Sequence, residues 1–139
     1  MTPKQSVEAE CARRGTVAVV TGCAALLSGE DADDALIIAL AGPPARYVLD
    51  TGPAPVHRYW LRVWGARGLL YAWGDGARPA VLAALGDEHW RVREMAAKVV
   101  ARRLLGEALP AVAGLAGDPV PRVRQAAQRA IARLTAAGA

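Results

Sequence analysis

The stretch "GDEHWRVREMAAKVVARRLL", residues 86–105, decides the fold because its pattern returns as "GDPVPRVRQAAQRAIARL", residues 117–134. Both stretches begin with Gly-Asp, continue with Arg-Val-Arg and then run through small and aliphatic residues, at an offset of 31 positions (86 to 117). A third stretch, "RYWLRVWGARGLLYAWG" at 58–74, aligns when Arg62-Val63 is set against Arg91-Val92, an offset of 29 (62 to 91). A period of about 20 to 50 residues indicates a stacked-repeat architecture.

Each long stretch has the pattern of a helix with one narrow polar stripe. On a helical wheel of about 100° per residue, Arg91, Lys98 and Arg102 lie together and most of the remaining surface is apolar. Residues 117–134 give the same wheel, so both helices must be covered by neighbours on several sides. A shorter apolar stretch and a Gly-Asp turn precede each of them. The sequence therefore predicts an all-α fold, a right-handed α-solenoid of stacked helical hairpins with about three repeats.

The turns carry residues that favour helix starts. Asp87 and Asp118 follow Gly86 and Gly117 and are predicted N-caps of the long helices. Pro119 is predicted to lie near the first position of the last helix, where the missing N–H costs nothing.

The two repeated stretches resemble HEAT repeats of the short bacterial type, in which an Asp is followed six positions later by the Arg of a Val-Arg pair. The resemblance covers residues 76–139, weakens over 54–75, where Trp64 stands at the place of that arginine, and is absent before. It implies a polar ladder between neighbouring repeats. The residues of this ladder would be Asp87, Arg93, Asp118 and Arg124.

Arg93 fits this ladder because it lies on the wheel about 200° from the exposed stripe. A charge in such a position must be paired, so we expect it to bind a carboxylate and backbone carbonyls between repeats.

The chain is predicted to form a single domain, 1–139, with units at 54–85, 86–116 and 117–139 and a degenerate N-terminal helical cap at 1–50. The cap is expected to hold two helices joined by the acidic turn "SGEDADD", with Asp31 or Asp33 as N-cap of the second. The proline-rich residues 42–60 are predicted to be a loop or a broken helix.

Positive charge is concentrated in the repeats. Residues 1–57 carry four basic and seven acidic residues, a net of −3, whereas 58–139 carry thirteen and six, a net of +7. This asymmetry indicates a binding face for an acidic partner; a plain solvated face is the alternative. If the long helices stack in register, their stripes form one basic, concave face with Trp73 and Trp60 as aromatic anchors. The predicted binding face comprises Arg62, Trp73, Arg91, Lys98, Arg102, Arg122, Arg129 and Arg133.

No motif for catalysis, metal binding or a cofactor stands out. His57 and His89 lack carboxylate or cysteine neighbours at metal-ligand spacing, and Cys11 and Cys23 match no metal or redox motif. No apolar stretch reaches the roughly 20 residues of a membrane span, and the N-terminus lacks the features of a signal peptide. We therefore expect a cytoplasmic protein that is not an enzyme, with no catalytic residues, metal or cofactor.

The favoured function is a non-enzymatic interaction or scaffold module that docks an acidic protein segment on the basic face. The alternative is a nucleic-acid-binding protein that contacts the phosphate backbone, related in shape to HEAT-like DNA glycosylases; a glycosylase-like or tetrapyrrole-lyase-like activity is less favoured. Ile131 and Leu134 are expected to be partly exposed at the end of the stack, which would allow a homodimer.

Overall fold

The computed structural model describes residues 1–51 and 58–138, and every regular element within these ranges is helical. The N-terminal part holds α1 (Pro3–Arg14), α2 (Thr16–Leu27), α3 (Asp34–Ala41) and α4 (Pro43–Thr51). The remaining elements are α5 (Tyr59–Gly68), η2 (Asp75–Ala77), α6 (Arg78–Ala84), α7 (Trp90–Arg103), η3 (Gly106–Ala108), α8 (Leu109–Leu115) and α9 (Pro121–Ala136).

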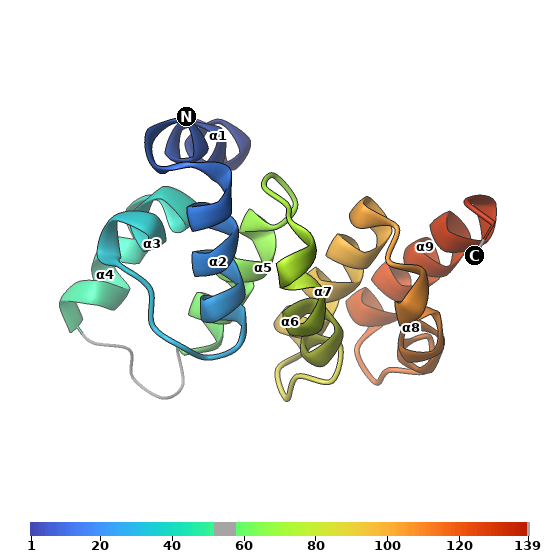
Figure 1. Ribbon diagram of the computed structural model, residues 1–139. Helices are drawn as coiled ribbons and strands as arrows, with labels where there is room; N and C mark the ends of the chain where they lie inside the picture. Colours follow the sequence, from blue (N-terminus) through green and yellow to red (C-terminus); the bar gives the residue numbers. More distant parts are fainter. Residues whose placement is uncertain (52–57, 139) are drawn as a thin grey trace.

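The helices form two layers. The longer helices α5, α7 and α9 follow one another along the molecule, with α7 packed against both of its neighbours (Figure 1). The shorter helices α6 and α8 cover α7 and α9, and α2 covers α5. The predicted α-solenoid of stacked helical hairpins is therefore confirmed.

The N-terminal part completes the stack in an unexpected order. Helix α2 packs on α5 as the first helix of a hairpin would, although α3 and α4 lie between them in the sequence. The two predicted cap helices correspond to α2 and α3, and Asp33 is the N-cap of α3, accepting the Leu36 N–H at 2.9 Å. Helix α1 was not predicted, and it packs on α2 and α3.

The proline-rich segment was predicted to be a loop or a broken helix. Residues 43–51 form helix α4, which excludes a loop there, while 52–57 lie outside the described residues. Pro43 and Pro44 occupy the first two helical positions, where a backbone N–H has no partner within the helix, so they start the helix instead of breaking it.

The predicted N-caps Asp87 and Asp118 are wrong by two residues. Each carboxylate accepts the N–H two positions ahead, from His89 at 2.8 Å and from Val120 at 2.9 Å, and the helices begin only after those residues. Likewise Pro121, not Pro119, is the first residue of α9. These bonds stabilise the turns before the helices. The same two carboxylates also bind arginines from the preceding repeat.

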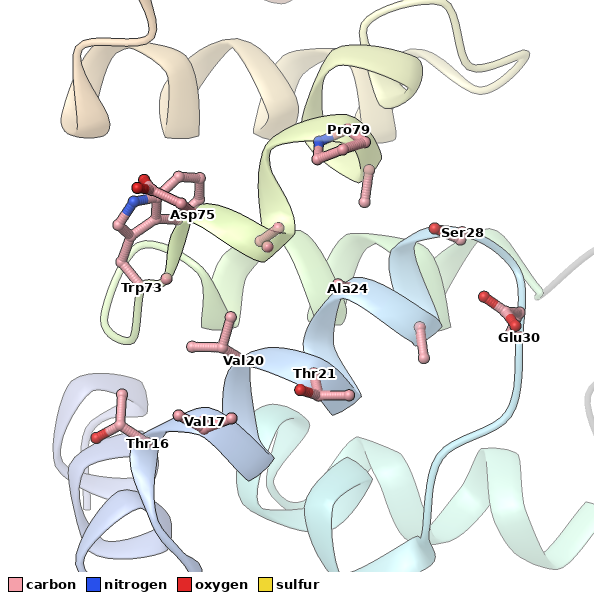
Figure 2. A pocket seen from close by; sticks show the side chains of 15 residues that line it. Thr16, Val17, Val20, Thr21, Ala24, Ser28, Glu30, Trp73, Asp75 and Pro79 are labelled. Atoms are coloured by element: carbon pink, nitrogen blue, oxygen red, sulfur yellow. The ribbon is translucent and has the colours of Figure 1, made fainter.

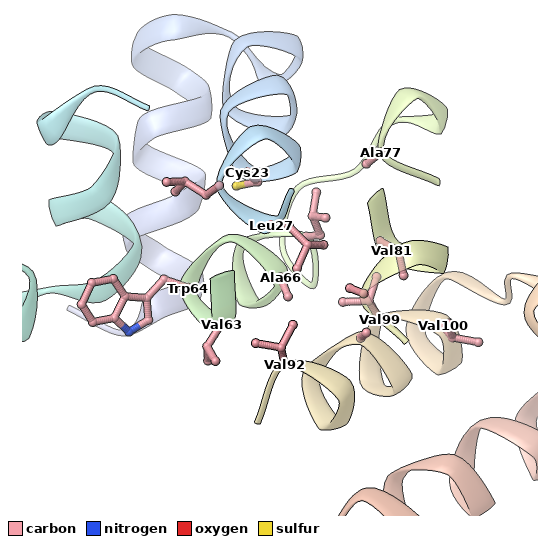
Figure 3. Packing of buried hydrophobic residues seen from close by; sticks show 14 of the residues in the cluster. Cys23, Leu27, Val63, Trp64, Ala66, Ala77, Val81, Val92, Val99 and Val100 are labelled. Atoms are coloured by element: carbon pink, nitrogen blue, oxygen red, sulfur yellow. The ribbon is translucent and has the colours of Figure 1, made fainter. Parts of the chain in front are cut away.

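The core is mostly aliphatic and continuous from the cap to the last hairpin. Figure 3 shows the part of it between α2 and α7. Cys23, Ala66 and Val99 are fully buried in it. Burial raises the pKa of the Cys23 thiol to about 12, so this cysteine is a packing residue at neutral pH. Both cysteines are free thiols.

Close contact between α2 and α5 depends on glycine. A Cβ atom at Gly65 would lie 2.7 Å from the carbonyl oxygen of Cys23 and 2.9 Å from Cβ of Leu26. A Cβ at Gly68 would lie 2.6 Å from the sulfur of Cys23. The absence of side chains at these two positions sets the distance between the helices.

The C-terminal end of the stack is less apolar than expected. Leu134 is 1% exposed, so its predicted partial exposure is wrong; Ile131 is partly buried. The exposed residues of α9 include Gln125 and Gln128. No described helix combines the length and the apolar character required to cross a membrane.

We expect stability to fall in acid through Asp33. Its carboxylate binds Arg14 and the Leu36 N–H, which lowers its pKa from an ordinary 3.8 to about 2. A group whose pKa is depressed on folding stabilises the fold above the unfolded value and loses that contribution as pH falls through the folded value. The free energy of unfolding, measured in urea at stepped pH, should therefore decline between about pH 4 and pH 2. Asp33→Asn should show a shallower decline; equal slopes would contradict the assignment.

Candidate binding face

Two arginine–aspartate pairs join successive repeats. Arg62 of α5 donates from Nε to Oδ2 of Asp87 at 2.9 Å, and Arg93 of α7 donates from Nε to Oδ2 of Asp118 at 2.9 Å. In both pairs a second nitrogen, Nη2, binds the other carboxylate oxygen. The side chains are 17% exposed or less, so solvent screens these pairs far less than it screens surface ion pairs.

The ladder arginines also hold their own turns. Nη1 of Arg93 donates to the carbonyl oxygens of Asp87 at 2.9 Å and Glu88 at 3.2 Å. Nη1 of Arg124 makes the same contacts with the carbonyls of Asp118 and Pro119. Arg93 thus ties the turn that precedes its helix to the turn of the next repeat.

Asp118 shows the electrostatic balance at this junction. Burial disfavours its charged form, but the hydrogen bonds from Arg93 and the Val120 N–H outweigh that effect, and the pKa of Asp118 lies below its ordinary value. The carboxylate is therefore ionised at neutral pH and pairs fully with the guanidinium.

The ladder reveals that the repeats are all offset by 31 residues. Arg62 and Arg93 each bind an aspartate 25 residues further along, so Arg62 is the equivalent of Arg93 (62 to 93), not of Arg91. The predicted offset of 29 for the first unit is wrong, and Trp64 does not take the ladder position. An error of two positions rotates a helix by about 200° on the wheel, which is why Arg62 was placed on the binding face.

The corrected offset changes the first-unit members of the exposed columns. With this offset Trp60 and Arg67 of α5 join the columns, and Arg62, which was predicted there, does not. The columns are Trp60/Arg91/Arg122, Arg67/Lys98/Arg129 and Arg102/Arg133; the first-unit position of the third column, Tyr71, lies beyond the end of α5 at Gly68.

The first column is a row of stacked rings and guanidinium groups. The guanidinium carbon of Arg91 lies 5.1 Å from the ring centroid of Trp60 and 4.6 Å from that of Trp90. Arg122 lies 5.2 Å from the Trp90 ring, and its guanidinium also binds Glu94 at 2.9 Å. The sequence marked Trp60 as an anchor, but this stacking was not predicted, since it becomes visible only with the offset of 31.

A second stack braces the row. The ring of His89 lies 3.7 Å from the ring of Tyr59, nearly parallel to it, and its Nδ1 accepts the Arg91 N–H at 3.2 Å. Burial, followed by the nearby charge of Arg91, lowers the pKa of His89 and keeps the ring neutral. A neutral ring can accept that N–H and so fix the start of α7 beneath the guanidinium.

The other two columns carry unpaired positive charge. Lys98 has Glu94 at 3.8 Å, whereas no carboxylate of the described residues lies within ion-pair distance of Arg102, Arg129 or Arg133. All three of these arginines are exposed. Helices α5, α7 and α9 together contain eleven basic residues and one acid, Glu94. We name Arg91, Lys98, Arg102, Arg122, Arg129 and Arg133 the basic face.

Trp73 does not belong to this face. Helix α5 ends at Gly68, so Trp73 lies in the segment beyond it, 5.6 Å from the guanidinium carbon of Arg103. Its side chain lines a cavity of about 660 Å³ on the side of α2, between that helix and the start of α6 (Figure 2). The prediction extended α5 too far, which turned a residue of the connection into one of the stripe.

Within residues 1–51 and 58–138, no group of three or more His, Cys, Asp or Glu side chains is arranged to hold a metal ion. The ionisable groups described above serve the ladder, the helix starts or the basic face.

The two-layered stack and its regular ladder define the protein as a helical-repeat α-solenoid. The chain belongs to the HEAT-repeat family: the model for HEAT repeats matches residues 57–136, more than half of the chain. Neither the curated proteins nor the solved structures gave a match.

Proposed function

We propose that this protein is a non-enzymatic interaction module that binds an acidic protein segment on the basic face. HEAT repeats generally mediate protein–protein interactions, and the positive charge of the basic face favours an acidic partner. The observation that carries the proposal is the set of three exposed arginines, Arg102, Arg129 and Arg133, without a carboxylate partner among the described residues.

The regular spacing of these charges suits a partner that runs across the helices. Arg102 and Arg133 occupy equivalent positions on α7 and α9, and packed helix axes lie about 8–10 Å apart. An extended segment with several carboxylates can therefore meet one guanidinium per repeat. Each such contact is charge-assisted, and the guanidinium can bind both oxygens of one carboxylate.

Arg91 adds a preorganised contact. Its guanidinium is held between the rings of Trp60 and Trp90, and no described carboxylate pairs with it. A side chain that is already ordered loses less conformational entropy on binding than a free arginine does. The position of Arg91 at the start of α7 places this contact at one end of the basic face.

The test reverses charge on the basic face alone. We expect Arg102→Glu combined with Arg133→Glu to weaken binding of a labelled peptide of alternating Glu and Gly by about tenfold or more, because two attractive contacts become repulsive. Fluorescence anisotropy at low salt measures the affinity. Lys4→Glu combined with Arg58→Glu is the matched control, since it changes the net charge equally at exposed positions off the basic face. This control should bind like the parent.

The nucleic-acid alternative is tested with the same proteins. Duplex DNA of random sequence that binds more tightly than the peptide, with a steep loss of affinity against the logarithm of salt concentration, would replace this proposal. Equal loss of peptide binding in both double variants would also overturn it, because net charge instead of the face would then determine affinity.

A further inference from the structure

A hollow of about 460 Å³ lies between α4 and α5, at the end of the row of stacked rings. Trp60 and Trp64 of α5 and Tyr47 of α4 line it. The remaining lining residues are Ala41, Pro44, Val48 and Arg67. Its volume falls within the range of about 300–1,000 Å³ typical of pockets that take compact ligands, and its walls are mostly apolar.

The hollow and the basic face share a wall. Trp60 lines the hollow and also contacts the guanidinium of Arg91 at 5.1 Å. Trp64 forms the floor, being 5% exposed, and it lies at the edge of the aliphatic core (Figure 3). The hollow therefore adjoins the basic face at Arg91, and a ligand that lies along the face can extend directly into it.

The charges around the hollow select its occupant. Arg67 reaches into it from α5, its guanidinium donates to the carbonyl of Leu40, and Arg91 lies behind Trp60. Three aromatic rings alone would suit a cationic group, but two guanidinium groups at the same place repel one. A large apolar side chain flanked by carboxylates satisfies both the rings and the arginines.

Resting on the proposed function, we infer that the hollow receives one large apolar side chain of the acidic partner segment, of the size of Phe or Leu. The partner is thus an acidic peptide with an apolar anchor, and Tyr47, Trp60 and Trp64 form the anchor pocket. A few anchor side chains carry most of the affinity in many protein interfaces, while charges around them set orientation.

The experiment compares two peptides on the intact protein. One alternates Glu and Gly, and the other has a single Phe in place of a central Gly. We expect the Phe to raise affinity by about ten- to one-hundredfold, the range that burial of such a side chain gives. In Tyr47→Ala that gain should fall to a few-fold, with affinity for the Phe-free peptide unchanged.

Two tryptophan variants serve as a matched pair. Trp60→Ala should lose the gain from Phe and also weaken both peptides, because Arg91 loses one of its rings. Trp73→Ala removes a tryptophan from a different cavity and should keep the gain. The inference is overturned if Phe gives no gain with the parent, or if the gain survives in both Tyr47→Ala and Trp60→Ala. It is overturned as well if Tyr47→Ala weakens binding of oligothymidylate but not binding of the Phe peptide.

A third peptide, with Gln for every Glu and the Phe kept, separates this inference from the proposed function. Weak binding of this peptide supports both statements. Binding as tight as that of the acidic Phe peptide would refute the acidic partner while leaving an apolar pocket. Binding of both acidic peptides with equal affinity would refute the pocket and leave the proposed function intact.

Discussion

Gly65→Ala is expected to destabilise the protein by about 2–3 kcal/mol, although alanine has a higher helix propensity than glycine. The new methyl group would lie 2.7 Å from the carbonyl oxygen of Cys23 and 3.0 Å from the backbone nitrogen of Leu27. Backbone atoms of α2 cannot move aside as a side chain could, so the two helices must separate. Separation opens the contact through which α2 covers the first repeat.

Gly114→Ala is the matched control for that prediction. Gly114 lies in α8, and apart from its chain neighbours and the backbone of its own helix no atom comes within 4 Å of a Cβ built there. The same substitution should therefore stabilise the protein by about 0.5–1 kcal/mol through helix propensity alone. Urea unfolding followed by helical circular dichroism measures both variants. Two changes of the same sign would show that the α2–α5 contact is looser than described.

Arg93→Ala is expected to destabilise the fold by about 2–3 kcal/mol. The substitution removes two bonds to Asp118 and two to the carbonyls of Asp87 and Glu88. It leaves the carboxylate of Asp118, 6% exposed, without its guanidinium, and the penalty of a buried unpaired charge exceeds the value of the bonds themselves. Breaking this junction should also make α8 and α9 unfold before the remaining helices.

Arg102→Ala is the control on the same helix, because it removes the same residue type and charge from an exposed position without a described ion-pair partner. We expect the free energy of unfolding to change by less than about 0.5 kcal/mol. Its effect should appear instead in binding of the acidic peptide, which Arg93→Ala leaves nearly unchanged at temperatures where it is folded. A melt lowered equally by both variants would show that the ladder and the basic face are not separate.

The repeats illustrate how much of the fold can be predicted from the sequence pattern. Residues 86–105 and 117–134 share spacing, turn residues and apolar periodicity, so hairpins, layers and the unusual position of Arg93 could be predicted from them. The first unit lacks the Gly-Asp turn, and its Arg62-Val63 pair matches Arg91-Val92 as well as any other alignment does. In the structure, the bond from Arg62 to Asp87 and the starts of α5, α7 and α9 at Tyr59, Trp90 and Pro121 distinguish an offset of 31 from one of 29.

The candidate site likewise has a part that could be predicted from the sequence and a part that could not. The column residues of α7 and α9 could be predicted, because on a regular helix the sequence position sets the direction of a side chain. The row of Trp60, Arg91 and Trp90 and the hollow beside it could not, since they depend on which helices become neighbours. Helix α4 supplies one wall of that hollow from a segment whose prolines suggested a loop or a broken helix.

The sequence by itself determined the class of fold, the hairpin period in the last two repeats and the concentration of positive charge on the long helices. These follow from local rules: helical periodicity, turn chemistry and the need to cover apolar surface. The tertiary structure alone decided the register of the first repeat, the close contact at Gly65, the partners of each arginine and the aromatic hollow. Those features depend on distances between residues far apart in the chain, and such distances exist only once the helices have packed.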